Sequence, residues 1–127
     1  MHFSSACITT HHLVKNEDLN HHGTLYAGRI AEWFVETGFM TAASLLPSEN
    51  LVCVKIHDMT FKCPVWAGET VRLTGEVVEA GRTSLRVRVT LSVKEKEIME
   101  GFATFVHVDE SGKAAPHGII LMEENEK

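Results

Sequence analysis

The stretch NHHGTLYAGRIAEWFVETGFMTAASLLP, residues 20–47, determines how this chain folds. Asn20 to Gly23 have the residue types of a tight turn, and Thr24 is a candidate N-cap for a helix that Pro47 would end. Between Thr24 and Pro47 nearly every residue is apolar or small, and a helix that is apolar almost all round is usually a buried one. The stretch therefore predicts one long central helix wrapped by other elements of the chain.

Three charged residues interrupt this apolar helix. Arg29, Glu32 and Glu36 are spaced i, i+3 and i+7, so they share one helix face. Their charge argues against a membrane span. The spacing leaves two explanations open: an Arg–Glu ladder on a partly solvated edge, or an active-site acid at a subunit interface.

Length and charge bound the class of protein. The chain has 127 residues and a formal net charge of -5 at pH 7, which predict a single domain over residues 1–127 and argue against a nucleic-acid or anionic-membrane partner. Cys7, Cys53 and Cys63 form no CxxC pair and no zinc-binding spacing, and the first residues lack a signal-peptide pattern. We therefore expect a cytoplasmic protein with reduced thiols, and a buried Cys53 because it lies in an apolar run.

The histidines do not form a recognisable metal motif. Four of the eight occur as adjacent pairs, His11–His12 and His21–His22. Neighbours along a strand point to opposite faces, so such pairs make poor joint ligands. The chain also lacks a Gly-x-Ser-x-Gly elbow and a Gly-rich phosphate loop. We expect no metal site and no serine hydrolase chemistry.

The other segments have the patterns of β-strands. Strands are expected at residues 4–14, 51–56, 69–79, 85–93 and 98–108. The second could continue through a bend near Asp58 to Lys62, and Gly75 in the third marks either a bulge or a close approach of backbone. Apolar and polar residues alternate most clearly over 85–93, as they do in a strand with one buried face.

Short connections between these strands make them antiparallel neighbours. The order of elements therefore predicts an α+β fold, with one antiparallel sheet wrapped around one long central helix. Such a sheet covers only one side of the helix. The uncovered side and the free edge of the sheet predict a homo-oligomer, a dimer or a tetramer.

Three motifs, in order along the chain, resemble the hotdog-fold acyl-CoA thioesterases. NHHGTLYAGRIAEW, at residues 20–33, is similar to the Asn-x-x-Gly-Thr-Leu-Phe-Gly-Gly turn that opens the central helix in that family. FKCPVWAGETVRL at 61–73 resembles its Pro-x-x-x-Gly-Asp/Glu loop, and EAGRTSLRVRV at 79–89 resembles a hairpin that often touches coenzyme A. The resemblance implies the hotdog fold, an acyl-CoA substrate, and no metal or redox cofactor.

The resemblance also implies roles at the turn that opens the helix. The backbone amides of Ala27 and Gly28 would hold the thioester carbonyl, as the unpaired donors at a helix N-terminus can. Asn20 would position a water molecule or the carbonyl. His22, beside Gly23, would face the thioester or be a plain turn residue.

A second implied site lies at a hairpin turn further along the chain. The coenzyme A phosphates would meet Arg82 and its neighbours Gly81, Thr83 and Ser84. An acidic chain needs such a local cation to hold phosphate groups.

The sequence departs from the family at the catalytic acid. The family places this acid seven residues after its second glycine, where this chain has Val35. Glu36 follows directly and Glu32 lies one turn before. We assign Glu36 as the general base, with Glu32 second, because Glu36 is nearer to the expected position and burial would suit it to work near neutrality.

Two functions follow from these features. The first is an acyl-CoA thioesterase that releases coenzyme A and a carboxylic acid. The alternative is a non-catalytic ligand sensor, a hotdog module that binds acyl-CoA, which Val35 at the acid position favours.

Overall fold

The computed structural model describes residues 2–4 and 6–121. Its first half contains β1 (His2–Ser4), β2 (Cys7–Leu13), the 3₁₀ turn η1 (Asn16–Asp18), the helix α1 (Ala27–Ala43) and the 3₁₀ turn η2 (Ser48–Asn50). After these come β3 (Leu51–Phe61), β4 (Thr70–Ala80), β5 (Ser84–Val93), β6 (Lys96–His107) and β7 (Ile119–Leu121). The strand expected at residues 4–14 is thus two strands, and residue 5 lies outside the described residues.

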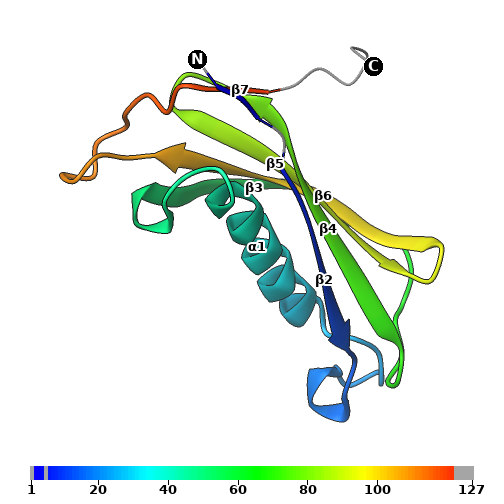
Figure 1. Cartoon of the computed structure of the whole chain (residues 1–127). Helices are drawn as coiled ribbons and strands as arrows, with labels where there is room; N and C mark the ends of the chain where they lie inside the picture. The colour runs from blue at the N-terminus through cyan, green and yellow to red at the C-terminus, as the bar shows by residue number, and fades with distance from the viewer. Residues whose placement is uncertain (1, 5, 122–127) are drawn as a thin grey trace.

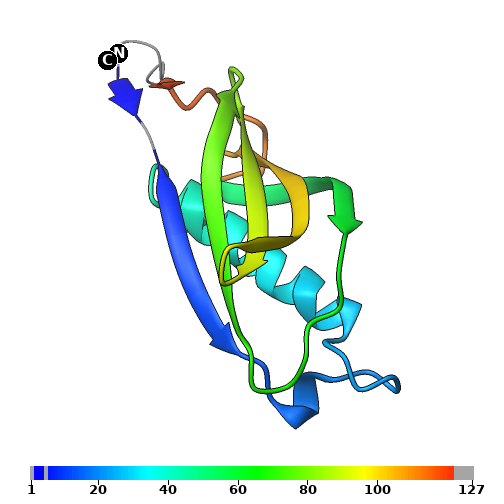
Figure 2. The ribbon, with the colours of Figure 1, turned by 90° about the vertical axis from the view of Figure 1, so that its right-hand side faces the viewer.

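One five-stranded antiparallel sheet packs against one helix. The strand order is β2-β4-β5-β6-β3, and α1 lies along the inner side of this curved sheet (Figure 1). Turned by 90°, the same arrangement shows the helix crossing one face of the strands (Figure 2). β1 and β7 form a separate parallel pair. The predicted α+β architecture is confirmed.

One connection differs from the prediction of short hairpins. β3 pairs with β6 at the far edge of the sheet, so β3 and β4 are not neighbours. The connection between them, residues 62–69, crosses three strand spacings, or about 14 Å, which eight extended residues with a reach of about 26 Å can span. Pro64 breaks the ladder and Gly68, with a φ of 89°, makes the turn, as expected.

The helix begins later than predicted. Its N-cap is Tyr26, whereas Thr24 forms an isolated antiparallel bridge with Trp66. The later start has a local cause: Thr24 donates its amide hydrogen to the side chain of Asn20, and the backbone stays extended as far as Tyr26. The last helical residue is Ala43, four residues before Pro47.

The helix is buried on one side only. Its sheet-facing residues are the buried ones: Ile30, Trp33, Phe34, Thr37, Gly38, Thr41 and Ala42. Glu32, Glu36 and Met40 on the opposite side are exposed. The prediction that a single sheet covers only one side of the helix is therefore confirmed.

The helix and the sheet meet closely at Gly75 on β4. A Cβ atom at this position would lie 2.2 Å from Oγ1 of Thr41, so the close approach that the sequence allowed is present. The Thr41 hydroxyl itself donates a 2.7 Å hydrogen bond to the carbonyl oxygen of Thr37. The bulge in β4 lies further along, between Val77 and Glu79.

The edge strand β3 carries exposed apolar side chains. It bends as predicted near Asp58, which has a φ of 56° and lies within a shift of register. Ile56 and Phe61 pair with buried residues of β6 and so share the helix-side face of the sheet, yet both are 46% exposed. Cys53 is exposed as well, which corrects its predicted burial: an edge strand has no neighbour to cover it.

Candidate active site

The turn before the helix is organised by the side chain of Asn20. Its Oδ1 accepts hydrogen bonds from the amides of His22 at 2.8 Å and Thr24 at 3.2 Å, and its Nδ2 donates to the Thr24 hydroxyl at 3.1 Å. Gly23 completes the turn with a φ of 81°, a conformation that favours glycine. These contacts give Asn20 a role in shaping the turn, while its role toward a substrate stays a prediction.

The helix N-terminus presents two amides without a backbone partner. Arg29 and Ile30 donate their amide hydrogens to the carbonyl oxygen of Tyr26, at 3.0 and 3.1 Å. Within the described residues, no backbone hydrogen bond from the amides of Ala27 and Gly28 is found outside the helix, and their position precludes one within it. Both residues are exposed. Such donors at the positive end of a helix dipole can stabilise a developing oxyanion.

Gly28 leaves room for an aromatic ring beside these amides. A Cβ atom at this position would lie 2.3 Å from Cε2 of Tyr26, so the ring occupies the space that a larger residue would need. Tyr26 is itself 56% exposed. An exposed ring therefore lies next to the candidate oxyanion site.

The two candidate acids differ in their surroundings. Glu32 forms an ion pair with Arg29, with 3.2 Å between Oε1 and the guanidinium nitrogen. Glu36 lies one turn further along the exposed face, and no ion pair to it is found among the described residues. Its predicted burial is absent in the single chain. Val35, at the position where the family has its acid, packs against the core.

One chain cannot bring Glu36 to its own oxyanion amides. Glu36 lies eight positions after Gly28 in the chain, and a rise of 1.5 Å per residue puts them about 12 Å apart along the helix. A carboxylate and an amide that act on one carbonyl must lie much closer together. A complete site with this acid therefore requires a second copy of the chain.

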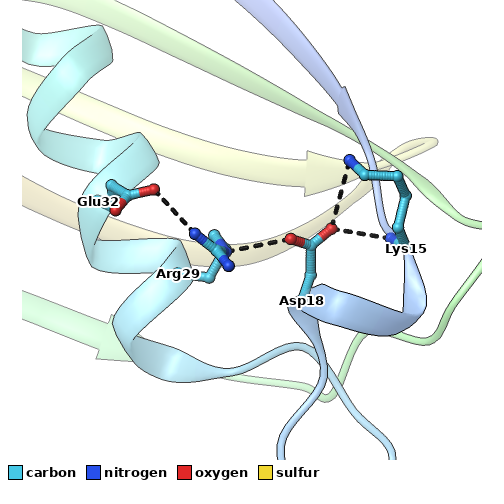
Figure 3. A network of polar contacts seen from close by, with 4 residues as sticks. All are labelled: Lys15, Asp18, Arg29 and Glu32. Atoms are coloured by element: carbon cyan, nitrogen blue, oxygen red, sulfur yellow. Dashed lines mark hydrogen bonds and ion pairs between the residues drawn. The ribbon is translucent and has the colours of Figure 1, made fainter.

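A network of charges surrounds the start of the helix (Figure 3). Arg29 lies between Glu32 and Asp18, whose Oδ1 is 3.1 Å from the Arg29 Nε. Asp18 in turn accepts a 2.8 Å hydrogen bond from the amide of Lys15. The hydrogen bond to Glu32, followed by the attraction of the Glu32 and Asp18 charges, outweighs desolvation and raises the pKa of Arg29. Arg29 therefore stays a cation.

Sequence reasoning missed Asp18. Its side chain is only 5% exposed, although Asp normally lies at the surface. A signal was present in the spacing of Lys15 and Asp18, i and i+3, but this spacing does not reveal burial.

The predicted phosphate-binding turn lies at the opposite end of the sheet from this network. Gly81 donates its amide to the carbonyl of Ser84 at 2.9 Å, and this closes the turn and leaves Arg82 exposed. A pocket of about 370 Å³ lies beside it, lined by Gly81, Arg82 and residues 116–120. The C-terminal segment is held to the turn by a 3.2 Å hydrogen bond from the amide of His117 to the carbonyl of Arg82.

Histidines of the adjacent pairs contact other aromatic rings. His12 stacks on Trp33, with 4.3 Å between ring centroids, and Trp33 is in the core. His21 and His22 lie against each other on the surface. In the part of the chain that the structure describes, no group of three His, Cys, Asp or Glu side chains is arranged to hold a metal ion. Nor does any described helix have the length and apolarity needed to cross a membrane.

Comparisons with known proteins show the family and the fold of this chain. Residues 22–100 match the thioesterase superfamily. An uncharacterized acyl-CoA thioester hydrolase of Bacillus subtilis is 28% identical over 116 residues, which cover 87% of this chain and 67% of that protein. A solved apo-hexameric acyl-CoA thioesterase is 29% identical with a TM-score of 0.83, over 93% of this chain and 80% of that one. A hexameric hotdog fold thioesterase of Campylobacter jejuni is 25% identical with a TM-score of 0.75, over 84% and 86%.

Proposed function

The chain belongs to the thioesterase superfamily and has the hotdog fold, and from this premise we propose that it hydrolyses acyl-CoA thioesters. In this reaction water adds to the carbonyl carbon, the carbon–sulfur bond breaks, and the products are a carboxylic acid and the coenzyme A thiol. The observation that carries the proposal is the exposed helix N-terminus, where the amides of Ala27 and Gly28 have no backbone partner among the described residues.

These two amides are proposed to hold the thioester oxygen as it gains negative charge. A donor placed in this way typically contributes about 10²–10³ in kcat. Asn20, His22 and Gly23 form the turn that borders the amides, and we assign them to the thioester end of the substrate-binding site.

Glu36 is the acid that we propose as general base. Both glutamates are exposed on the same helix face, but the carboxylate of Glu32 is held in an ion pair by Arg29. Glu36 keeps a free carboxylate for a water molecule. Val35 packs on the core and cannot take this role.

The proposed site is shared between two copies of the chain. Antiparallel helices of neighbouring subunits would bring Glu36 of one copy to the Ala27 and Gly28 amides of the other. Exposed apolar side chains are available for this contact on the helix and on the edge strand β3: Met40, Ile56 and Phe61 are each at least 44% exposed. Hexameric relatives support assembly beyond the predicted dimer or tetramer.

The phosphorylated end of coenzyme A is assigned to the turn formed by Gly81, Arg82, Thr83 and Ser84. Arg82 is an exposed cation beside a pocket of about 370 Å³ in a chain with a net charge of -5. An arginine side chain pairs well with phosphate oxygens because its planar donors match their geometry.

A thiol-release assay across acyl-CoAs of different chain length tests this function. Turnover by the wild-type protein supports it. The second candidate, a non-catalytic acyl-CoA sensor, has Val35 in its favour, and it predicts saturable binding of acyl-CoA with no thiol release. Absence of both turnover and binding would contradict both candidates.

A further inference from the structure

The buried carboxylate of Asp18 takes no part in the proposed chemistry. Its side chain is 5% exposed, and a buried carboxylate is unfavourable unless charges and hydrogen bonds compensate it. The compensation here comes from the Lys15 amide at 2.8 Å, the Lys15 ammonium at 3.8 Å and the Arg29 guanidinium at 3.1 Å. The Arg29 contact is ionic, because the Nε–H of Arg29 has no hydrogen-bond partner in the part of the chain that the structure describes.

Asp18 contacts the helix on both sides of the oxyanion amides. Its backbone carbonyl accepts a 2.8 Å hydrogen bond from the amide of Tyr26, and its side chain pairs with Arg29. Ala27 and Gly28 are the two residues between these contacts. The pairing of Leu19 with Leu25 in an antiparallel bridge ties the same two segments together next to Asp18.

We propose that Asp18 is a positioning residue that fixes the Ala27 and Gly28 amides for oxyanion binding. The inference rests on the proposed function, since it takes these amides as the oxyanion donors. Donors must lie about 2.7–3.1 Å from the place where the charge develops, so a small shift of the first helical turn weakens them. We call the two contacts of Asp18, with the Tyr26 amide and with the Arg29 side chain, the clamp. Figure 3 shows the second of them, with Arg29 directed from the helix toward Asp18.

Arg29 has an electrostatic role in the same clamp. It lies between the anions Asp18 and Glu32, each within 3.2 Å. Without this cation, the negative charges of the two carboxylates would cancel the positive potential at the helix N-terminus and repel the oxyanion. The ion pair with Arg29 therefore allows the carboxylate of Asp18 to lie close to an anion-binding site.

The Asp18→Asn variant tests the clamp, because asparagine keeps the shape and can still accept the Lys15 amide hydrogen. We expect kcat to fall about 10-fold or more while KM changes by less than about 2-fold, because the lost contact acts in the transition state. Arg29→Gln should give a similar loss, and the double variant should lose little more than either single one. Glu76→Gln is the matched control, since Glu76 pairs with Arg88 at 2.7 Å far from the helix start, and it should leave kcat unchanged.

Hydrogen–deuterium exchange adds a readout that does not depend on turnover. Amides of residues 20–30 should exchange faster in Asp18→Asn and in Arg29→Gln than in wild type or Glu76→Gln. If the two variants show this faster exchange while the wild-type protein has no turnover, the clamp is supported and the proposed function is rejected. Unchanged exchange in residues 20–30, or a wild-type kcat in both clamp variants, would overturn the inference. Should Asp18→Asn fail to fold, the partly exposed Arg29 provides the deciding variant.

Discussion

Replacing Gly75 with alanine should destabilise the protein, because the helix leaves no room for a methyl group there. The new Cβ would lie 2.2 Å from Oγ1 of Thr41, and an ordinary contact of about 3.4 Å requires a movement of roughly 1.2 Å. The Thr37 side chain and carbonyl, both at 3.3 Å, block a sideways escape.

The structure offers two ways to relieve this contact, and both are unfavourable. If α1 moves away, packing between the helix and the sheet loosens at a cost of about 1–3 kcal/mol. If Thr41 rotates, it loses its buried hydrogen bond to the Thr37 carbonyl, also at about 1–3 kcal/mol. Alanine regains about 0.5–1 kcal/mol of backbone entropy in a strand. The expected net loss is about 1–2 kcal/mol, or about 4–8 °C in Tm.

Chemical and thermal unfolding followed by circular dichroism measures this loss. Gly38→Ala is the matched control at the same helix–sheet contact: its Cβ would meet the Phe105 ring at an ordinary 3.4 Å, so helix propensity should stabilise it by about 0.5–1 kcal/mol. Thr41→Ala should relieve the strain of Gly75→Ala in a double-mutant cycle. A Gly75→Ala protein as stable as wild type, or no coupling to Thr41→Ala, would refute the packing described for these residues.

Three further predictions concern the assembly and the substrate site. Light scattering at micromolar concentration should report a dimer or a larger oligomer, since Met40 on α1 and several apolar side chains on the edge strand β3 are exposed; a stable monomer would rule out the shared site. Arg82→Ala should raise the KM for acyl-CoA several-fold with little change in kcat, whereas Arg88→Ala, which breaks an exposed pair with Glu76, should leave KM unchanged. An unaltered KM in Arg82→Ala would place the phosphates elsewhere. Gly28→Ala should keep the Tm within a few degrees because the exposed Tyr26 ring can swing away, yet lower kcat by crowding the oxyanion donors; a wild-type kcat would exclude Gly28 from that role.

The fold could be predicted where the spacing of apolar residues and the turn residues at the ends of an element are both clear. The alternation over 85–93 gave β5 to within one residue of its start, because one face of this strand is buried throughout. The helix was recognisable from its apolar length, but its first residue was not. The side chain of Asn20 captures the amide of Thr24, and this competition between local hydrogen bonds is invisible in residue types alone.

The connection from β3 to β4 is a second feature that the sequence did not predict. Rules for short hairpins predict neighbouring strands, whereas the longer segment 62–69 reaches across the sheet, and only pairing with β6 fixes where β3 lies.

The candidate site was predictable as a segment and less so as a set of side chains. The turn of Asn20 to Gly23 and the helix start follow from the motif, because backbone geometry there depends on few residue types. The surroundings of Glu32 and Glu36 depend on tertiary contacts and on a second subunit. Asp18 was missed because its burial results from the packing of η1 against the helix start, which no local pattern encodes.

The comparison of two variants one helical turn apart tests the central claim most directly. Glu36→Gln and Glu32→Gln make the same chemical change on the same exposed face of α1, and their kcat values can be measured by thiol release from acyl-CoA. Our account predicts a loss of about 10²-fold or more for Glu36→Gln and a far smaller one for Glu32→Gln. Full activity in Glu36→Gln with none in Glu32→Gln would contradict the assignment. A wild-type protein that releases no thiol, together with a Val35→Asp variant that does, would contradict the enzymatic function itself.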